Sequence, residues 1–176
     1  MVALLRGVNV GGRGTLAMAD LRRVAEGCGH TDVRTYVQSG NLVFSTTSRS
    51  TRTVADGLRD AIAEATDVRP DVVVRTAREL HRVIDDNPYA DRDPEPTQLH
   101  VVFLPGTAKA SLPGLDLDAF APEHATARGQ HLYLYLPDGA GRSKLATTLA
   151  RGAGAEGTMR NWRTVTKLAE MADATP

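Results

Sequence analysis

The first 76 residues alternate short apolar runs with helical patterns, and this order limits the fold more than any other feature of the chain. Four runs are either continuously apolar or alternate apolar with polar residues, which is typical of strands. Two longer segments repeat apolar residues at helical spacing. The expected strands are Val2–Leu5, Val33–Val37, Leu42–Phe44 and Val72–Val74, and the expected helices run over Met18–Cys28 and Val54–Ala65. The order β-α-β-β-α-β predicts an α+β fold with a ferredoxin-like N-terminal half.

The second half gives fewer signals and is expected to be a looser α+β unit. Thr76-Ala-Arg-Glu79 is a capping box, which predicts a helix to about Asp86. The charged and proline-rich stretch Asp91–Pro96 is expected to be a linker. Beyond it we expect strands at Leu99–Leu104 and His131–Leu136, a short helix at Leu115–Phe120, and helices capped by Ser143 and Asn161; residues 105–128 are otherwise unassigned. The predicted domains are therefore 1–76 and 98–176, with a helix and linker at 77–97.

Composition limits the environment and the partners of the chain. The chain has 21 Lys+Arg and 21 Asp+Glu residues, and this neutral total counts against a nucleic-acid partner, which stays open as an alternative. Cys28 is the only cysteine, so neither an internal disulfide nor a thiolate zinc cluster can form. We expect Cys28 to be buried with no metal nearby. No signal peptide or membrane-spanning run is visible, which predicts a cytoplasmic protein without a membrane partner.

Polar residues follow the first two predicted strands. If these strands lie in one sheet, joined by a helix, they run parallel and end at the same edge. The glycine-rich loop Arg6–Thr15 leaves the first strand and the turn Gln38–Asn41 leaves the second. Backbone amides and a helix N-terminus favour an anion. We therefore predict a ligand site at this rim, made by Arg6, Asn9, Gly11, Gly12, Gln38, Ser39, Gly40 and Asn41.

The same residues also have a purely structural interpretation. Glycines in a tight loop permit positive φ angles, and Ser39, Gly40 and Asn41 are ordinary turn residues. The glycines match neither the dinucleotide fingerprint nor the phosphate loop. Both interpretations stay open on the sequence alone.

Arg160-Asn161-Trp162 is a second concentration of polar and aromatic residues. Asn161 can cap the last helix, and Trp162 fits its apolar face. Arg160 is not needed for that apolar pattern, so it is a candidate ligand residue. We predict that Arg160 and Asn161 approach the rim and complete the site.

Other motifs that carry chemistry are missing from the sequence. The histidines have no metal-ligand spacing, and there is no nucleophile elbow. We expect no cofactor and no metal, and the sequence identifies no catalytic residue.

Five stretches of the chain together resemble a bacterial family known as domain of unknown function 1697. They are Leu4–Gly12, Arg34–Phe44, Asn87–Tyr89, Gly141–Leu145 and Thr158–Leu168, in order over nearly the whole chain. The resemblance implies an α+β fold built from ferredoxin-like parts. It implies no activity and no catalytic residue.

Three functions are consistent with these observations. The first is a binding module for a small anionic or phosphate-bearing ligand at the rim. The second is a protein-protein interaction or self-association module, which a large exposed apolar patch would favour. The third is a nucleic-acid backbone binder, which a continuous stripe of arginines would favour. The sequence specifies neither a ligand nor an oligomeric state, and it leaves open whether any reaction is catalysed.

Overall fold

The computed structural model describes residues 1–9, 15–106, 109–112 and 114–174. This part of the chain is mixed α+β, with two four-stranded antiparallel sheets. It forms two compact units, one made by Met1–Leu80 with Leu168–Pro176 and the other by His81–Lys167. The two units are called the first and the second unit below. The predicted α+β class is confirmed.

The first unit contains the elements β1 (Val2–Arg6), α1 (Met18–Gly27), β2 (Thr31–Tyr36), β3 (Asn41–Ser45), α2 (Thr51–Ala65) and β4 (Asp71–Arg75). Its sheet has the strand order β2-β3-β1-β4. Both β1 and β2 pair antiparallel with β3, so they run in the same direction with β3 between them. The predicted common edge for their ends is therefore present.

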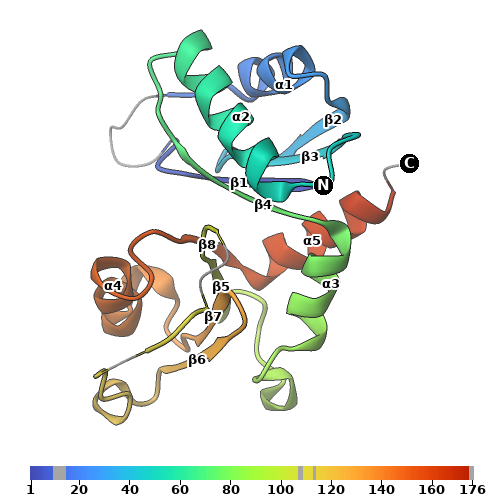
Figure 1. The fold of residues 1–176 in the computed structure, drawn as a ribbon. Helices are drawn as coiled ribbons and strands as arrows, with labels where there is room; N and C mark the ends of the chain where they lie inside the picture. Colours follow the sequence, from blue (N-terminus) through green and yellow to red (C-terminus); the bar gives the residue numbers. More distant parts are fainter. Residues whose placement is uncertain (10–14, 107–108, 113, 175–176) are drawn as a thin grey trace. The chain divides into compact units, whose positions relative to one another are not determined.

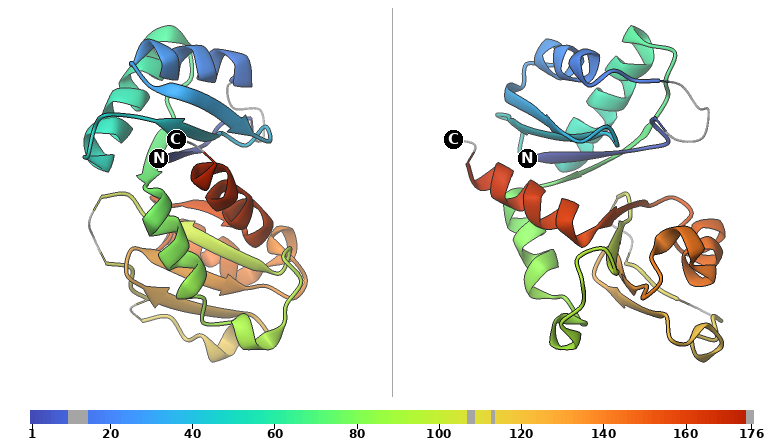
Figure 2. Two further views of the ribbon diagram at one scale, coloured as in Figure 1. Left: turned by 90° about the vertical axis from the view of Figure 1, so that its right-hand side faces the viewer. Right: turned by 180° about the vertical axis from the view of Figure 1, so that it is seen from behind.

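Two helices cover one face of the first sheet. Figures 1 and 2 show α1 and α2 on the same side of it. The spacing of Val54, Leu58 and Ile62 places all three on one face of α2, where they are buried with Leu42 and Phe44. Ser50 caps α2 by accepting a hydrogen bond from the Thr53 amide at 3.1 Å. Helical spacing and the Ser50 cap therefore account for α2, and its buried face agrees with the core of the first unit.

The helix α3 (Ala77–Asp85) begins in the first unit at the predicted capping box. The Thr76 amide donates to Glu79 Oε2 at 2.7 Å, and the Glu79 amide donates to Thr76 Oγ1 at 3.2 Å. The end of α5 (Trp162–Asp173) also belongs to the first unit, because Arg34 Nη2 donates to the Met171 carbonyl at 2.6 Å. The last helix is thus divided between the two units.

The second unit has a sheet of the order β6-β7-β5-β8. Helix α4 packs on one of its faces, where Leu145 and Leu149 are buried with Leu132 and Leu134. Ser143 caps α4 as predicted, accepting from the Ala146 amide at 2.8 Å. The elements are η1 (Ala90–Arg92), β5 (Leu99–Phe103), η2 (Asp118–Phe120), β6 (His124–Arg128), β7 (His131–Tyr135), η3 (Ala140–Arg142), α4 (Lys144–Arg151) and β8 (Thr158–Asn161).

Several sequence predictions for the second unit need correction. It is not looser than the first, since it has a complete four-stranded sheet. The edge strands β6 and β8 were not predicted, because His124–Arg128 carries only alanines as apolar residues and Thr158–Asn161 is mostly polar. The helix expected over Leu115–Phe120 is only the 3-10 turn at Asp118–Phe120, and another turn, Ala90–Arg92, overlaps the start of the expected linker.

The prediction for Cys28 was wrong. Cys28 is the residue that ends α1, where the chain turns toward β2, and it is exposed. Helical spacing placed it on the buried face, but that face stops at Ala25. Partial burial still raises the pKa of the thiol. Among the described residues no helix has the length and apolar character needed to cross a membrane.

Candidate functional site

The rim is the edge of the first sheet at which β1 and β2 end. Here we use the name for Arg6–Asn9 and Val37–Asn41. Asn9 ties the two segments together, because its Nδ2 donates to the Gln38 carbonyl at 2.8 Å. The same Nδ2 donates to the Leu16 carbonyl at 2.9 Å, and Asn9 Oδ1 accepts from the Leu16 amide at 2.9 Å. Asn9 thus connects the loop after β1, the β2–β3 turn and the chain that enters α1.

Gly40 brings the turn against β1. The Leu5 amide donates to the Gly40 carbonyl at 2.8 Å. Gly40 has a φ of +72°, and an added Cβ would lie 2.7 Å from Leu5 Cβ and 2.6 Å from Val8 Cγ2. The glycine is therefore required by both conformation and close approach.

The backbone of the rim adopts the left-handed region at several positions. Asn9 has a φ of +55° and Val37 a φ of +50°. Asn tolerates this region, but a β-branched residue rarely adopts it. Val37 is also 51% exposed, so packing does not account for its conformation. Strained backbone of this kind is concentrated at functional sites.

Two polar side chains of the rim are directed toward solvent. Gln38 is exposed, and the Arg6 side chain is 40% exposed. Arg6 Nη1 lies 3.7 Å from Asp71 Oδ2 on the neighbouring strand β4, and the Asp71 side chain is 68% exposed. An ion pair this long and this exposed contributes little to stability. The Arg6 guanidinium is therefore accessible to a ligand.

Other rim side chains build the turn itself. Asn41 is buried, and its Nδ2 donates to the Tyr36 carbonyl and to Ser39 Oγ, both at 3.0 Å. Asn9, Ser39, Gly40 and Asn41 therefore have structural roles in the rim, and a ligand role for them stays a prediction. Gly11 and Gly12 lie outside the described residues.

The start of α1 adjoins this rim through Leu16. The N-cap residue is Ala17, and among the described residues no side chain caps the first turn of α1. The first amides of a helix have no intrahelical acceptor, and they carry the positive end of the helix dipole. Asp20 in this turn is paired with Arg23 at 2.8 Å. The uncapped start of α1 therefore offers free backbone amides, which suit an anion.

Arg160 and Asn161 lie in the second unit, at the end of β8. Arg160 is buried, and its Nη1 donates to Thr158 Oγ1 at 2.7 Å and to the Met159 carbonyl at 2.9 Å. Burial lowers the pKa of Arg160 to about 10. Asn161 caps α5 as predicted, accepting from the Thr164 amide at 2.9 Å. Both residues therefore have structural roles inside their own unit.

Arg75 and His30 were not predicted from the sequence. Arg75 ends β4 directly before the cap of α3 and is buried, with a pKa lowered by burial. Its position resembles that of Arg160 before the cap of α5, a parallel that the sequence contained. His30 follows α1 in the segment Cys28-Gly-His30, for which the sequence analysis predicts no role.

Comparison with known proteins places the chain in a family. A family model described as "Protein of unknown function (DUF1697)" matches residues 1–133. The chain belongs to this family. No curated protein matches the chain. Among solved structures, the chain is similar to conserved bacterial protein SP0830 from Streptococcus pneumoniae, with a TM-score of 0.70 and 19% identity over 97% of each chain. At this identity, the likeness of the DUF1697 chain to that structure concerns the fold alone.

Two further observations bear on the chemistry available to this DUF1697 protein. The described residues contain no group of three or more His, Cys, Asp or Glu side chains that could hold a metal ion. Their exposed large apolar side chains are Val37 and Met159, and the two lie in different units.

Proposed function

We propose that the rim binds a small anionic or phosphate-bearing ligand. Arg6 supplies the positive charge, Gln38 supplies hydrogen bonds, and the uncapped start of α1 supplies backbone amides. The glycine-rich segment with Gly11 and Gly12 belongs to the same proposal. Asn9, Ser39, Gly40 and Asn41 hold the two segments in place, and their predicted contact with the ligand remains part of the proposal.

The strained β2–β3 turn supports this proposal most directly. The β2–β3 turn has four residues and contains Val37 at a φ of +50°. The corresponding β6–β7 turn in the second sheet has two residues, Gly129 and Gln130. The strand order is equivalent in both sheets, so the fold itself does not require the strain at Val37. A requirement for ligand contact accounts for it.

We also propose a more specific fold type for the first unit. The element order β-α-β-β-α-β and the antiparallel strand order of the first sheet support a ferredoxin-like type for the first unit. We keep the bacterial cytoplasm as the proposed location.

The test of the function is anion binding measured by calorimetry and thermal shift, with inorganic phosphate, pyrophosphate and ADP as probes. We expect Arg6→Ala to abolish binding while it changes the free energy of unfolding by less than about 0.5 kcal/mol. Asp71→Asn removes the carboxylate that competes for Arg6 and should tighten binding.

The matched control is Arg59→Ala. Arg59 is also a surface arginine in exposed ion pairs, but it lies on α2 rather than at the rim. Equal loss of binding in Arg59→Ala and Arg6→Ala would indicate a general effect of charge. Absence of binding by every probe would contradict the proposal.

That Arg160 and Asn161 complete this site stays a prediction. Arg160→Lys keeps the charge and tests whether the guanidinium contributes to anion affinity. An unchanged affinity would restrict the site to the first unit. The alternatives are an interaction module and a nucleic-acid backbone binder. Concentration-dependent association without anion binding would favour the former, and binding to unrelated DNA sequences that weakens steeply with salt would favour the latter.

A further inference from the structure

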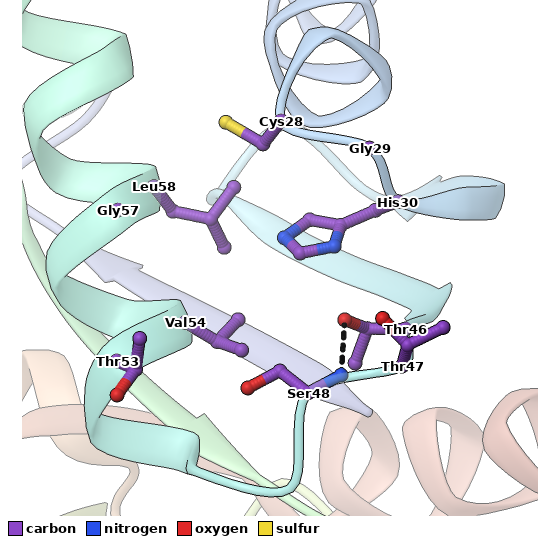
Figure 3. Close-up of a pocket in the computed structure, with 10 residues that line it drawn as sticks. All are labelled: Cys28, Gly29, His30, Thr46, Thr47, Ser48, Thr53, Val54, Gly57 and Leu58. Atoms are coloured by element: carbon purple, nitrogen blue, oxygen red, sulfur yellow. Dashed lines mark hydrogen bonds between the residues drawn. The ribbon is translucent and has the colours of Figure 1, made fainter.

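A pocket opens on the first unit, away from the rim. It lies where α1 ends, β3 ends and α2 begins (Figure 3). Helix α1 starts beside the rim and ends at the pocket, and ten helical residues span about 15 Å. The lining residues are Cys28, Gly29, His30, Thr46, Thr47, Ser48, Thr53, Val54, Gly57 and Leu58. The pocket and the rim are therefore separate sites.

The lining combines an apolar wall with hydrogen-bonding groups and has no charge at neutral pH. Val54 and Leu58 of α2 form the wall, and none of the described lining residues is Arg, Lys, Asp or Glu. Burial lowers the pKa of His30, so the imidazole is neutral at pH 7. A pocket without charge selects an uncharged ligand, because burying an unpaired ion is costly.

The polar groups can both donate and accept hydrogen bonds. Thr46 Oγ1 accepts from the Ser48 amide at 3.2 Å, and Ser48 Oγ accepts from the Ser50 amide at 3.3 Å. Each hydroxyl keeps its own proton for donation. The His30 ring stacks on Phe44 at a centroid distance of 4.5 Å, and Figure 3 shows it projecting toward α2. Its Nδ1 is buried without a hydrogen-bond partner among the described residues.

Gly57 supports a ligand in this pocket independently of the polar side chains. It lies in the middle of α2, where glycine destabilises a helix relative to alanine. Its φ is not in the left-handed region, and an added Cβ would meet no atom within 4 Å. Neither conformation nor packing therefore requires glycine here. The missing side chain leaves one wall of the pocket open.

We propose that this pocket binds a small uncharged molecule with several hydrogen-bonding groups and one apolar face, of the size of a nucleobase or a monosaccharide. The cavity measures about 240 Å³. Drug-sized ligands occupy pockets of roughly 300–1,000 Å³, so the ligand is smaller than these. The His30 ring, stacked on Phe44, and the hydroxyls fix its orientation, while Val54 and Leu58 cover its apolar face.

The experiment uses the full chain with adenine, uracil, glucose and ribose as probes, measured by ligand-observed NMR and by the rate of Cys28 alkylation. We expect one probe class to bind and to slow the alkylation, because Cys28 lines the pocket. The class that does so distinguishes a base from a sugar. These probes carry no phosphate, so failure of the rim proposal would leave this result unaffected.

Two variants separate binding from folding. Gly57→Leu fills the open wall and should lower affinity by about tenfold or more while it raises the melting temperature. His30→Phe keeps the ring stack and removes both ring nitrogens, and should also weaken binding. The control is Glu64→Leu, which adds the same side chain two helical turns along the same face of α2, outside the pocket.

The outcomes are clear in both directions. Binding that is lost in Gly57→Leu and His30→Phe but kept in Glu64→Leu supports the proposal. If no probe binds at millimolar concentration, or if binding is unchanged in Gly57→Leu and His30→Phe, the proposal is wrong.

Discussion

The two units are built on the same strand order and differ at the places where ligands are expected. The first sheet has the order β2-β3-β1-β4 and the second β6-β7-β5-β8, which is the same order when each set is numbered from its own first strand. In both, the fourth strand carries a buried arginine beside the helix cap: Arg75 precedes Thr76, and Arg160 precedes Asn161. The strand order and the buried arginine before the helix cap are therefore features of the fold that both units share.

The main differences lie in the connections, and the β2–β3 ladder also has a register shift between Thr31 and Arg34 that the β6–β7 ladder lacks. In the first unit an α-helix follows the first strand, whereas the described part of the corresponding segment after β5 contains only the 3-10 turn η2. The strained four-residue turn at Val37 has a two-residue counterpart at Gly129. One topology therefore forms with or without the rim. The rim is an addition to the fold, which is typical of a functional site.

The largest expected effect concerns the turn glycines of the two sheets. Gly40→Ala should lower the free energy of unfolding by about 3 kcal/mol, because it combines a left-handed φ with a clash against Leu5 and Val8. Gly129→Ala has the φ strain without a close neighbour and should cost about 1 kcal/mol. Urea denaturation of both variants measures the difference. Equal losses would show that the two turns are packed alike.

The next largest effect concerns the hydrogen bonds that Asn9 makes at the rim. Asn9→Ala removes three hydrogen bonds and should lower stability by about 2 kcal/mol. In the second unit, Asn87 accepts a single bond from the Tyr89 amide at 3.0 Å, so Asn87→Ala should cost about 1 kcal/mol or less. Chemical denaturation of both variants tests this order. A smaller loss of stability for Asn9→Ala than for Asn87→Ala would mean that the rim keeps its structure without the Asn9 hydrogen bonds.

A stabilising change should come from Val37. Val37→Gly removes the strain of a β-branched residue in the left-handed region and should raise the free energy of unfolding by about 1 kcal/mol. Because the side chain is half exposed, little packing is lost. Val37→Ala is the control and should have a smaller effect. Destabilisation by Val37→Gly would show that the β2–β3 turn is not strained. The two sheets would then not differ in the strain of their turns.

The smallest effect concerns pH and is expected in both units. Burial lowers the pKa of His30 in the first unit and of His100 in the second. Between each lowered pKa and the ordinary value near 6.5, the unfolded chain binds more protons than the folded one. Stability should therefore fall as the pH falls below about 6.5. His100→Gln should flatten this dependence more than His30→Gln, because His100 is the more buried residue. Identical pH profiles for wild type and both variants would contradict this.

The local pattern of the sequence determined most elements and one part of the rim. Alternation and helical spacing predicted the strands and helices of the first unit, and the caps at Thr76, Ser143 and Asn161 were found from single residues and their neighbours. The common edge of β1 and β2 followed from chain direction alone. These features depend on interactions between residues close in sequence, so the sequence encodes them directly.

Only the tertiary structure decided the features that depend on distant contacts. Asn9 and Gln38 are 29 positions apart, and nothing in either segment specifies the bond between them. The edge strands β6 and β8 are held by pairing with apolar neighbours rather than by their own composition. Cys28 stands at the helical spacing of buried residues, yet the turn out of α1 leaves it exposed beside His30. Which side chains are accessible at the ends of regular elements is set by packing between elements, and local periodicity does not report it.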